Sequence, residues 1–226
     1  MTTFLSLYDL LSNIPLVYPV YFFYGAAFLF LGISISGKDL KASDLKLSSS
    51  LWMLGTFGFI HGFHEWLQLL PLIQGEQMMR QEIFLIKLIL LSTLILSFFF
   101  LLQFGLSLIS ALDQKQIKWI KGIPSVLALL WVVVLWKHGP LIDLLFLWQV
   151  EIGVRYTLGL TGGLVTGYGL ITYSTEVKSM SGPVSRNFLF SGIAIFFYGL
   201  LAGIIDLRTL LTLIHVPAEF LRGAAV

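Results

Sequence analysis

Six long apolar stretches, separated by short polar connections, dominate the sequence. An α-helix needs about 20 residues to cross the roughly 30 Å of hydrocarbon in a bilayer. The stretches reach or approach that length, and they predict six transmembrane helices at residues 15–36, 51–72, 83–111, 122–137, 145–173 and 187–205. The fourth is short, but Pro124 suits the first turn of a helix and a bilayer can thin locally around a short span.

The final stretch, residues 207–226, is apolar but interrupted by charged residues and a proline. We interpret it as an outer loop followed by the start of a further, seventh helix. The predicted fold class is therefore an all-α polytopic transmembrane helix bundle, organised as a single domain over residues 1–226. We expect such a chain to be either the front part of a longer protein or a standalone subunit.

The composition supports a membrane protein and excludes several other classes. Charged residues make up 12% of the 226, against about 25% in soluble domains. The absence of cysteine excludes disulfides, thiolate metal sites and cysteine nucleophiles. A formal net charge of +2 without a basic tract gives no reason to expect nucleic acid as a partner. Residues 1–16 contain no lysine or arginine, so we expect the first apolar stretch to remain as a helix and not to act as a secretory signal.

Lysine and arginine predict the orientation, because they are enriched in cytoplasmic loops. The connections after the first, third and fifth predicted helices carry eight, namely Lys38, Lys41, Lys46, Lys115, Lys118, Lys121, Lys178 and Arg186. The opposite side carries four, namely Arg80, Lys137, Arg208 and Arg222. We therefore predict that the N-terminus lies outside the cytoplasm.

The most informative polar residues lie inside the second apolar stretch. His61 precedes His64 by three residues and Glu65 by four, spacings that put side chains on one face of a helix. Ionisable groups in a transmembrane helix are costly and need partners, so each is a candidate functional residue. In the predicted orientation, all three lie in the outer half of their helix.

Lys87, Glu151 and Arg155 fall at the same predicted depth, in the outer halves of the third and fifth helices. Glu151 precedes Arg155 by four residues, the favourable order for an ion pair on one helical face. The pair can neutralise itself, or Arg155 can bind a carboxylate or anionic head group, which guanidinium does well. We predict that Glu65 and Arg155 face one shared cavity, lined by both histidines and balanced by Lys87 or Glu151.

Three interpretations of the face formed by His61, His64 and Glu65 remain open. Two imidazoles and a carboxylate suit a transition metal, although the spacing differs from the His-Glu-x-x-His of metalloproteases. A histidine facing another, such as His138 or His215, would suit haem. The third interpretation is a hydrogen-bonded network that binds an organic ligand or locks helices together. The sequence favours no particular cofactor.

No recognisable catalytic constellation accompanies these residues. The serines lack the glycine-flanked context of a serine nucleophile, and no pair of aspartates lies at mid-bilayer. The fifth and sixth stretches instead carry glycines four residues apart, including Gly159, Gly163, Gly167, Gly199 and Gly203. Small residues at that spacing let helices approach closely in lipid. The spacing predicts packing inside one bundle, with a homodimer face as the alternative.

Motifs at four places also occur together in one known kind of membrane region. They are the segments Phe57–Trp66, Val154–Gly159 with the following Gly162 and Gly163, Phe197–Gly203 and His215–Arg222. In this order they resemble the multi-span N-terminal membrane regions of bacterial sensor histidine kinases and related diguanylate cyclases. The resemblance implies a sensory module of the bacterial inner membrane with Glu65, Trp66 and Arg155 as its characteristic polar positions. No kinase or cyclase part follows in this sequence.

We therefore expect a sensory or ligand-binding membrane module with an outward-facing polar pocket, and no catalytic role. The candidate ligand-binding residues are His61, His64, Glu65, Trp66, Lys87, Glu151 and Arg155. The expected partners are the lipid bilayer and a cytoplasmic signalling domain or partner protein. The alternative is a haem- or metal-binding subunit of a membrane redox complex, with His61, His64 and Glu65 as its ligands.

Overall fold

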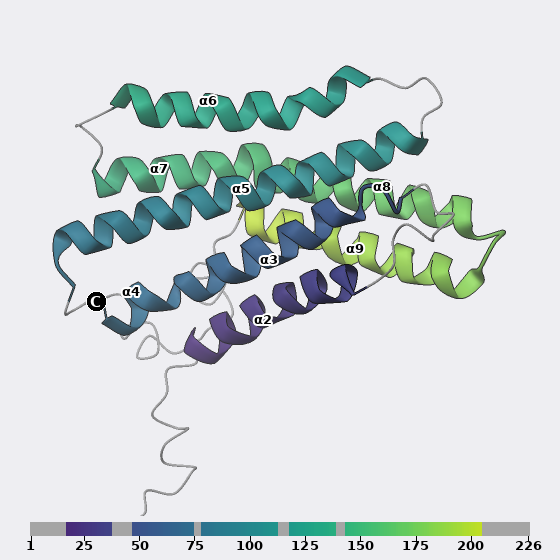
Figure 1. Ribbon diagram of the computed structural model, residues 1–226, viewed down its shortest axis with the longest axis horizontal. Helices are drawn as coiled ribbons and strands as arrows, with labels where there is room; N and C mark the ends of the chain where they lie inside the picture. Colours follow the sequence, from purple (N-terminus) through teal and green to yellow (C-terminus); the bar gives the residue numbers. More distant parts are fainter. Residues whose placement is uncertain (1–16, 38–46, 75–77, 113–117, 139–142, 205–226) are drawn as a thin grey trace, which may run out of the picture.

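The structure is a computed structural model that describes residues 17–37, 47–74, 78–112, 118–138 and 143–204, and these are helical apart from short turns (Figure 1). The helices are α2 (Val17–Ser36), α3 (Leu51–Leu67), α4 (Leu69–Gln74), α5 (Arg80–Leu112), α6 (Ile123–His138), α7 (Leu144–Val154), α8 (Thr161–Val177) and α9 (Gly182–Ile204). A 3₁₀ turn (Lys118–Gly122) precedes α6, and a π segment (Arg155–Leu160) joins α7 to α8.

Each of the six apolar stretches is helical over most of its length, and the described residues contain no strand. The prediction of an all-α fold is therefore confirmed. Among the described residues, four helical stretches are long and apolar enough to cross a membrane: Tyr18–Ser36, Arg80–Leu112, Ile120–His138 and Gly182–Ala202. The other two stretches are divided, one by a turn at Gln68 and one by the π segment. Residues 207–226 lie outside the described ranges.

Two helix starts show how local sequence sets the boundaries. Pro124 is the second residue of α6, as its preference for the first turn predicted. The sixth apolar stretch was predicted to begin at residue 187, but α9 begins at Gly182, because Pro183 also suits a first turn and its missing N–H would have no partner there. Polar residues in this turn hid the boundary from hydropathy.

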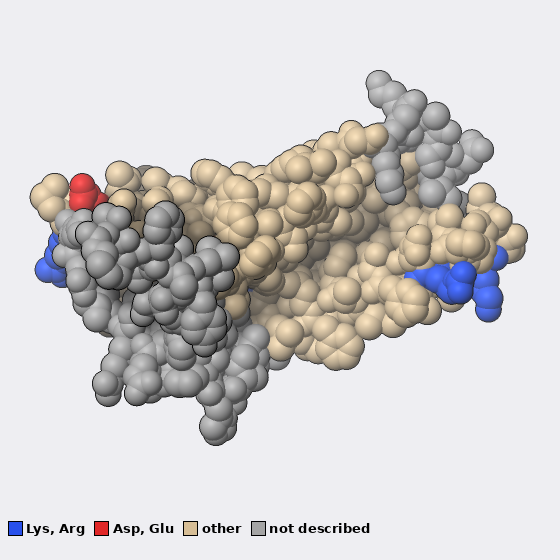
Figure 2. Space-filling view, turned by 90° about the horizontal axis from the view of Figure 1, so that it is seen from below, with Lys and Arg blue, Asp and Glu red and all other residues tan. Residues whose placement is uncertain are grey.

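The outside of the described helices is largely apolar. In α6 only Pro124 is buried, and Leu129, Leu130 and Val132 are among its exposed side chains. The face shown in Figure 2 carries its visible charged side chains at the two ends of the long axis, with an uncharged stretch between them. A surface of this kind suits hydrocarbon and not water, so the structure supports an integral membrane protein.

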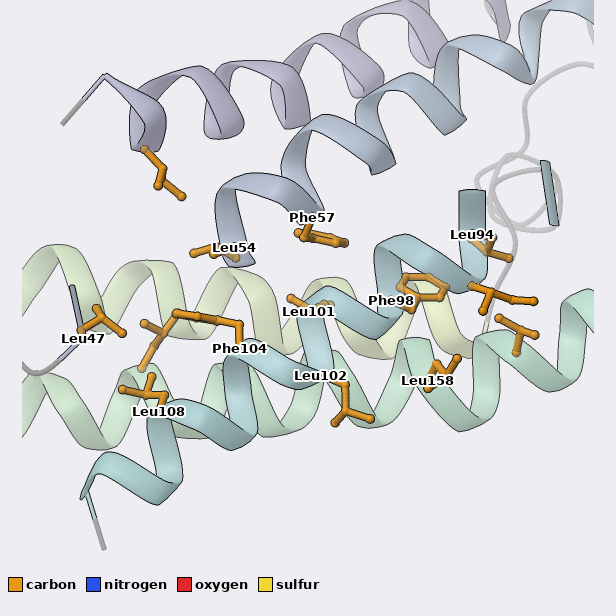
Figure 3. Packing of buried hydrophobic residues seen from close by; sticks show 14 of the residues in the cluster. Leu47, Leu54, Phe57, Leu94, Phe98, Leu101, Leu102, Phe104, Leu108 and Leu158 are labelled. Atoms are coloured by element: carbon orange, nitrogen blue, oxygen red, sulfur yellow. The ribbon is translucent and has the colours of Figure 1, made fainter. Parts of the chain in front are cut away.

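The centre of the bundle is α5. Its span has the largest buried share of the four candidate spans, 44%, whereas the span that includes α6 has the smallest, 6%. Figure 3 shows Phe98 and Leu101 of α5 between Phe57 of α3 on one side and Leu158 of the π segment on the other. All four side chains are at most 1% exposed, so α5 holds the two sides of the bundle together through a dry core.

Glycines bring α8 against α9 and α5. A methyl group on Gly163 would overlap the backbone of Gly199, and one on Gly167 would lie 2.8 Å from the carbonyl oxygen of Gly192. A methyl group on Gly162 of α8 would lie 3.3 Å from the backbone nitrogen of Leu102 in α5, and one on Gly159 of the π segment would lie 2.8 Å from the Phe98 ring. These glycines therefore pack helices of the same chain together, as predicted from their spacing.

The helices α7 and α8 form one long rod, with the π segment between them (Figure 1). A π turn contains one more residue than an α turn, so it rotates the side chains before it relative to those after it. The segment begins at Arg155, and its contacts include both α9 and α5. Nothing in the hydropathy pattern indicated it.

Candidate functional site

A cavity of about 410 Å³ lies between α2, α3 with α4, α5, α7 with the π segment, and α9. It lies toward the end of the bundle where α5 begins, because its residues come from the early part of α2, α5 and α7, the late part of α3 and α9, α4, and the start of the π segment. Its polar lining residues are Tyr21, Tyr24, His61, Glu65, Gln68, Lys87, Glu151, Arg155 and Tyr198. Its other lining residues are Pro71, Leu72, Leu90, Trp148, Ala194, Phe197, Leu201 and Ala202.

Five of the seven candidate residues meet in this cavity: His61, Glu65, Lys87, Glu151 and Arg155. Glu65 and Arg155 therefore share one cavity although they lie 90 positions apart in the sequence. His64 and Trp66 are not among the described lining residues. The role of these residues in ligand binding stays a prediction.

His61 is buried where α3, α5 and α9 meet. Its Nδ1 lies 3.2 Å from Oγ of Ser97, and that hydroxyl donates its own proton to the carbonyl of Leu94. Ser97 then accepts the N–H of His61, which assigns the ring proton to Nδ1 in a neutral imidazole. Nε2 is left as an acceptor, and the hydroxyl of Tyr198 lies 2.8 Å from it.

His64 repeats this arrangement one turn further along α3. Its Nδ1 lies 3.0 Å from Oγ1 of Thr93, whose hydroxyl donates to carbonyls one turn earlier in α5. Its Nε2 lies 3.1 Å from the amide nitrogen of Gln68, which is a donor. Both histidines are therefore satisfied as neutral rings, and both tie α3 to a hydroxyl of α5.

Glu65 is linked to His64 through Gln68 and lies beside His61. Its Oε2 accepts a hydrogen bond of 3.2 Å from the amide of Gln68. Its Oε1 lies 3.3 Å from Nε2 of His61, but that nitrogen is an acceptor in the assigned tautomer, so this contact is not a hydrogen bond. Within the described residues, no cation lies within 4.0 Å of this carboxylate. Among the described residues, neither Lys87 nor Arg155 forms an ion pair with Glu65.

Glu151 and Arg155 form the predicted ion pair. Both Nε and Nη2 of Arg155 donate to Oε1 of Glu151, at 3.1 and 2.9 Å. The third contact of the guanidinium is a long hydrogen bond of 3.4 Å from Nη1 to the carbonyl of Ala202 in α9. Arg155 therefore links α7 to α9 at the wall of the cavity, with its charge balanced within its own helix.

Lys87 is the other cation of the cavity, and it is half-buried on α5. Within the described part of the chain, no hydrogen bond or ion pair involves its ammonium group. It differs in this respect from Arg155. Lys87 and Glu65 thus face the same cavity from adjacent helices, and neither is paired with an opposite charge of any described residue.

Trp66 packs against α2 and not into the cavity. Its Nε1 donates to the carbonyl of Phe22, at 3.0 Å, and its ring stacks on the Phe22 ring with 5.6 Å between centroids. Its edge lies against Gly25, where a methyl group would overlap it. The Trp66 position suits the joining of α2 to α3, a contact that its place beside Glu65 in sequence did not indicate.

The histidines and Glu65 do not converge as metal ligands. No group of three possible metal-ligating residues was found within the described ranges. Both ring nitrogens of His61 and both of His64 are already within hydrogen-bond distance of a protein group. The site with His61, His64 and Glu65 as metal ligands has no counterpart in this arrangement, and His215, a possible haem ligand, lies outside the described residues.

Sequence reasoning missed Gln68, Tyr198 and the two hydroxyl partners in α5. Gln68 follows His64 by four residues and Glu65 by three, so helical spacing could have found it. Tyr198, Ser97 and Thr93 come from other helices, and only the packing brings them to the histidines. No family model, curated protein or solved structure matched the chain.

Proposed function

We propose that this protein is a sensory, ligand-binding module of the bacterial inner membrane. All six apolar stretches cross the bilayer in this proposal, with the N-terminus outside, so the cavity lies in the outer half. A ligand in the cavity changes the packing of the helices around it. That change is passed to a cytoplasmic signalling domain or partner protein, as the motif resemblance implies.

The observation that carries the proposal is the cavity itself. Ligand pockets commonly have volumes of roughly 300–1,000 Å³, and they combine apolar walls with a few convergent polar groups. The volume of about 410 Å³ lies in that range, and the lining has the same mixture. Ionisable side chains in membrane helices are costly, and their gathering at one cavity favours a binding role over chance.

The lining also contains elements able to transmit a change. A ligand shifts a bundle only by binding one arrangement of helices more tightly than another. Arg155 opens the π segment and contacts α9 through Ala202, while Tyr198 connects α9 to His61. A ligand that binds to Arg155 or Tyr198 and changes either contact would alter how α9 packs against the other helices.

Two measurements test the proposal. The protein is purified in mild detergent, and co-purifying small molecules are identified by mass spectrometry, with denatured protein as the control for carry-over. We expect one compound at near-stoichiometric amount, reduced when Ala194→Trp fills the cavity wall. Equal recovery from that variant, or no compound at all, would contradict a ligand-binding function.

The orientation is tested separately with reporter fusions. Fusions after Ser43 and Met180 should report the cytoplasm, and a fusion after Gly75 should report the exterior. A cytoplasmic signal at Gly75 would reverse the bundle and place the cavity in the inner half.

A further inference from the structure

The charges around the cavity fall into a closed pair and an open pair. Glu151 and Arg155 are joined by two hydrogen bonds and need no further partner. Glu65 and Lys87 also face the cavity, but no ion pair within 4.0 Å joins either of them to an opposite charge in the described ranges. The cavity thus presents a carboxyl group on one wall and an ammonium group on another, without direct neutralisation.

The surroundings of Glu65 suit an ammonium group. Tyr198 and Glu65 both approach Nε2 of His61, and Tyr24 lines the same cavity. Tyr21, Trp148 and Phe197 are the other aromatic residues of the described lining. Aromatic rings next to a carboxylate are a recurring way to bind an organic cation, because ring faces attract positive charge.

The balance of charge limits what the whole cavity can hold. Its described lining contains two carboxylates and two cations, so it is neutral when all four are ionised. A ligand with one net charge would leave an uncompensated charge among membrane helices, which is costly. A ligand with one positive and one negative group leaves the cavity neutral and supplies a partner to both Glu65 and Lys87.

We propose that the ligand is a zwitterion, bound with its ammonium group at Glu65 and its acid group at Lys87. This inference rests on the proposed function and specifies its ligand class. The apolar part of the ligand lies against Leu72, Leu90 and Leu201, which line the same cavity. The same chemistry is found in a free amino acid and in the headgroup of a zwitterionic lipid, and the experiment separates these sources.

The first arm uses the full chain in nanodiscs made only of phosphatidylglycerol, which is not zwitterionic. Straight-chain ω-amino acids of two to eight carbons and leucine are titrated by calorimetry, each beside its matched acid and matched amine. We expect at least one zwitterion to bind about tenfold or more tightly than both of its analogues, because each analogue leaves one buried charge unpaired.

The variants Glu65→Gln and Lys87→Met test the two contacts separately. Each should lower the affinity for the zwitterion about tenfold, while Glu65→Gln spares the matched acid and Lys87→Met spares the matched amine. Lys178→Met, which removes an exposed lysine at the end of α8, should leave the affinity unchanged. Thermal unfolding of each variant shows whether it is folded before titration.

The second arm adds phosphatidylethanolamine to the nanodiscs. If a lipid headgroup is the occupant, native mass spectrometry should show phosphatidylethanolamine retained over phosphatidylglycerol, and both variants should lose that preference. Zwitterion binding in either arm supports the inference.

Three results overturn it: a matched acid or amine that binds as tightly as its zwitterion, zwitterion binding that survives both substitutions, and no zwitterion bound in either arm. Zwitterion binding that survives both substitutions is the result expected if the ammonium group of Lys87 reaches the membrane surface and lies away from the cavity. A co-purified compound without paired charges would end this inference and leave the proposed function standing. Absence of any bound compound would end both.

Discussion

Gly163 of α8 and Arg155, about two turns earlier in the same rod, belong to regions that are held together in different ways. Around Gly163, helices touch backbone to backbone, and a single methyl group has no room. Around Arg155, the helices stand apart around a cavity and are joined by hydrogen bonds that side chains make to a backbone carbonyl or to another side chain. The first region tolerates almost no change in the distance between helices, whereas the second can exchange one set of polar contacts for another.

The contrast suggests a division of labour within one rod. Close packing of α8 on α9 and α5 fixes a scaffold, and the polar contacts of α3, α7 and α9 leave room for a ligand. The π segment lies at the boundary, where one side of the rod must serve the cavity and the other the glycine contacts. The predictions below act on one region at a time and so test whether the regions differ as described.

The largest effect is expected where the helices are closest. Gly163→Leu places a side chain where even a methyl group overlaps Gly199, so α8 and α9 must separate. We expect a loss of at least about 2 kcal/mol in the free energy of unfolding, or failure to fold. Gly182→Leu is the control, since nothing lies within 4 Å of a methyl group there. Equal thermal stability of the two variants would contradict the close packing.

The next largest effect concerns the π segment and compares two deletions in the same rod. Tyr156 lies within the π segment and Tyr168 within α8, and both side chains are exposed. Deletion of Tyr156 removes the extra residue and restores an α-helix, whereas deletion of Tyr168 rotates the following residues by about 100° relative to those before. We expect the Tyr168 deletion to lower stability by at least about 2 kcal/mol more than the Tyr156 deletion.

Thermal unfolding in detergent gives the comparison, and ligand retention shows what the π segment does. The Tyr156 deletion should fold yet lose the co-purified compound, because loss of the π turn changes the local backbone that positions Arg155 beside α9. Equal losses of stability from the two deletions would show that the π segment does not arise from one inserted residue.

Much of the scaffold follows from sequence, for physical reasons that particular residues illustrate. Hydropathy finds the spans because lipid selects long apolar helices, and the interval between Gly163 and Gly167 indicates close packing because small residues have few other uses at that spacing. The pairing of Glu151 with Arg155 follows from the geometry of one helix. Each of these signals is local.

The rest of the site depends on contacts between helices far apart in sequence. Tyr198 lies 137 positions from His61, and no local pattern indicates that the two side chains meet. The π segment changes the rotation of the helix without changing its hydropathy. The sequence therefore predicted how far along its helix Arg155 lies, but not the direction in which its side chain points. Trp66 turned toward α2 because Gly25 leaves room for its ring. Sequence thus predicted which residues are unusual better than what they touch.

A smaller effect is expected from breaking the closed ion pair. Glu151→Gln leaves the half-buried Arg155 with no carboxylate, and we expect a loss of about 1–3 kcal/mol, since removing one partner strands the other charge. The double variant Glu151→Gln with Arg155→Gln should recover part of that loss, because no charge remains. Chemical denaturation measures both. The double variant also loses the contact of Arg155 with Ala202. If its free energy of unfolding falls below that of the single variant by more than this contact is worth, Arg155 is held chiefly by α9 and not by Glu151.

The smallest effect concerns one buried hydroxyl near the middle of α5. Ser97→Ala removes the acceptor for the Nδ1–H of His61, and the ring is only 1% exposed, so water does not readily replace the serine. An unsatisfied buried donor costs about 1–3 kcal/mol, and we expect a loss near the lower end because the substitution leaves only a small gap. Ser92→Ala is the control, since that exposed hydroxyl bonds only to a carbonyl of its own helix, and its loss should cost less than about 0.5 kcal/mol. If both variants unfold at the same temperature, His61 does not depend on Ser97, and its ring proton is free to serve the cavity side instead.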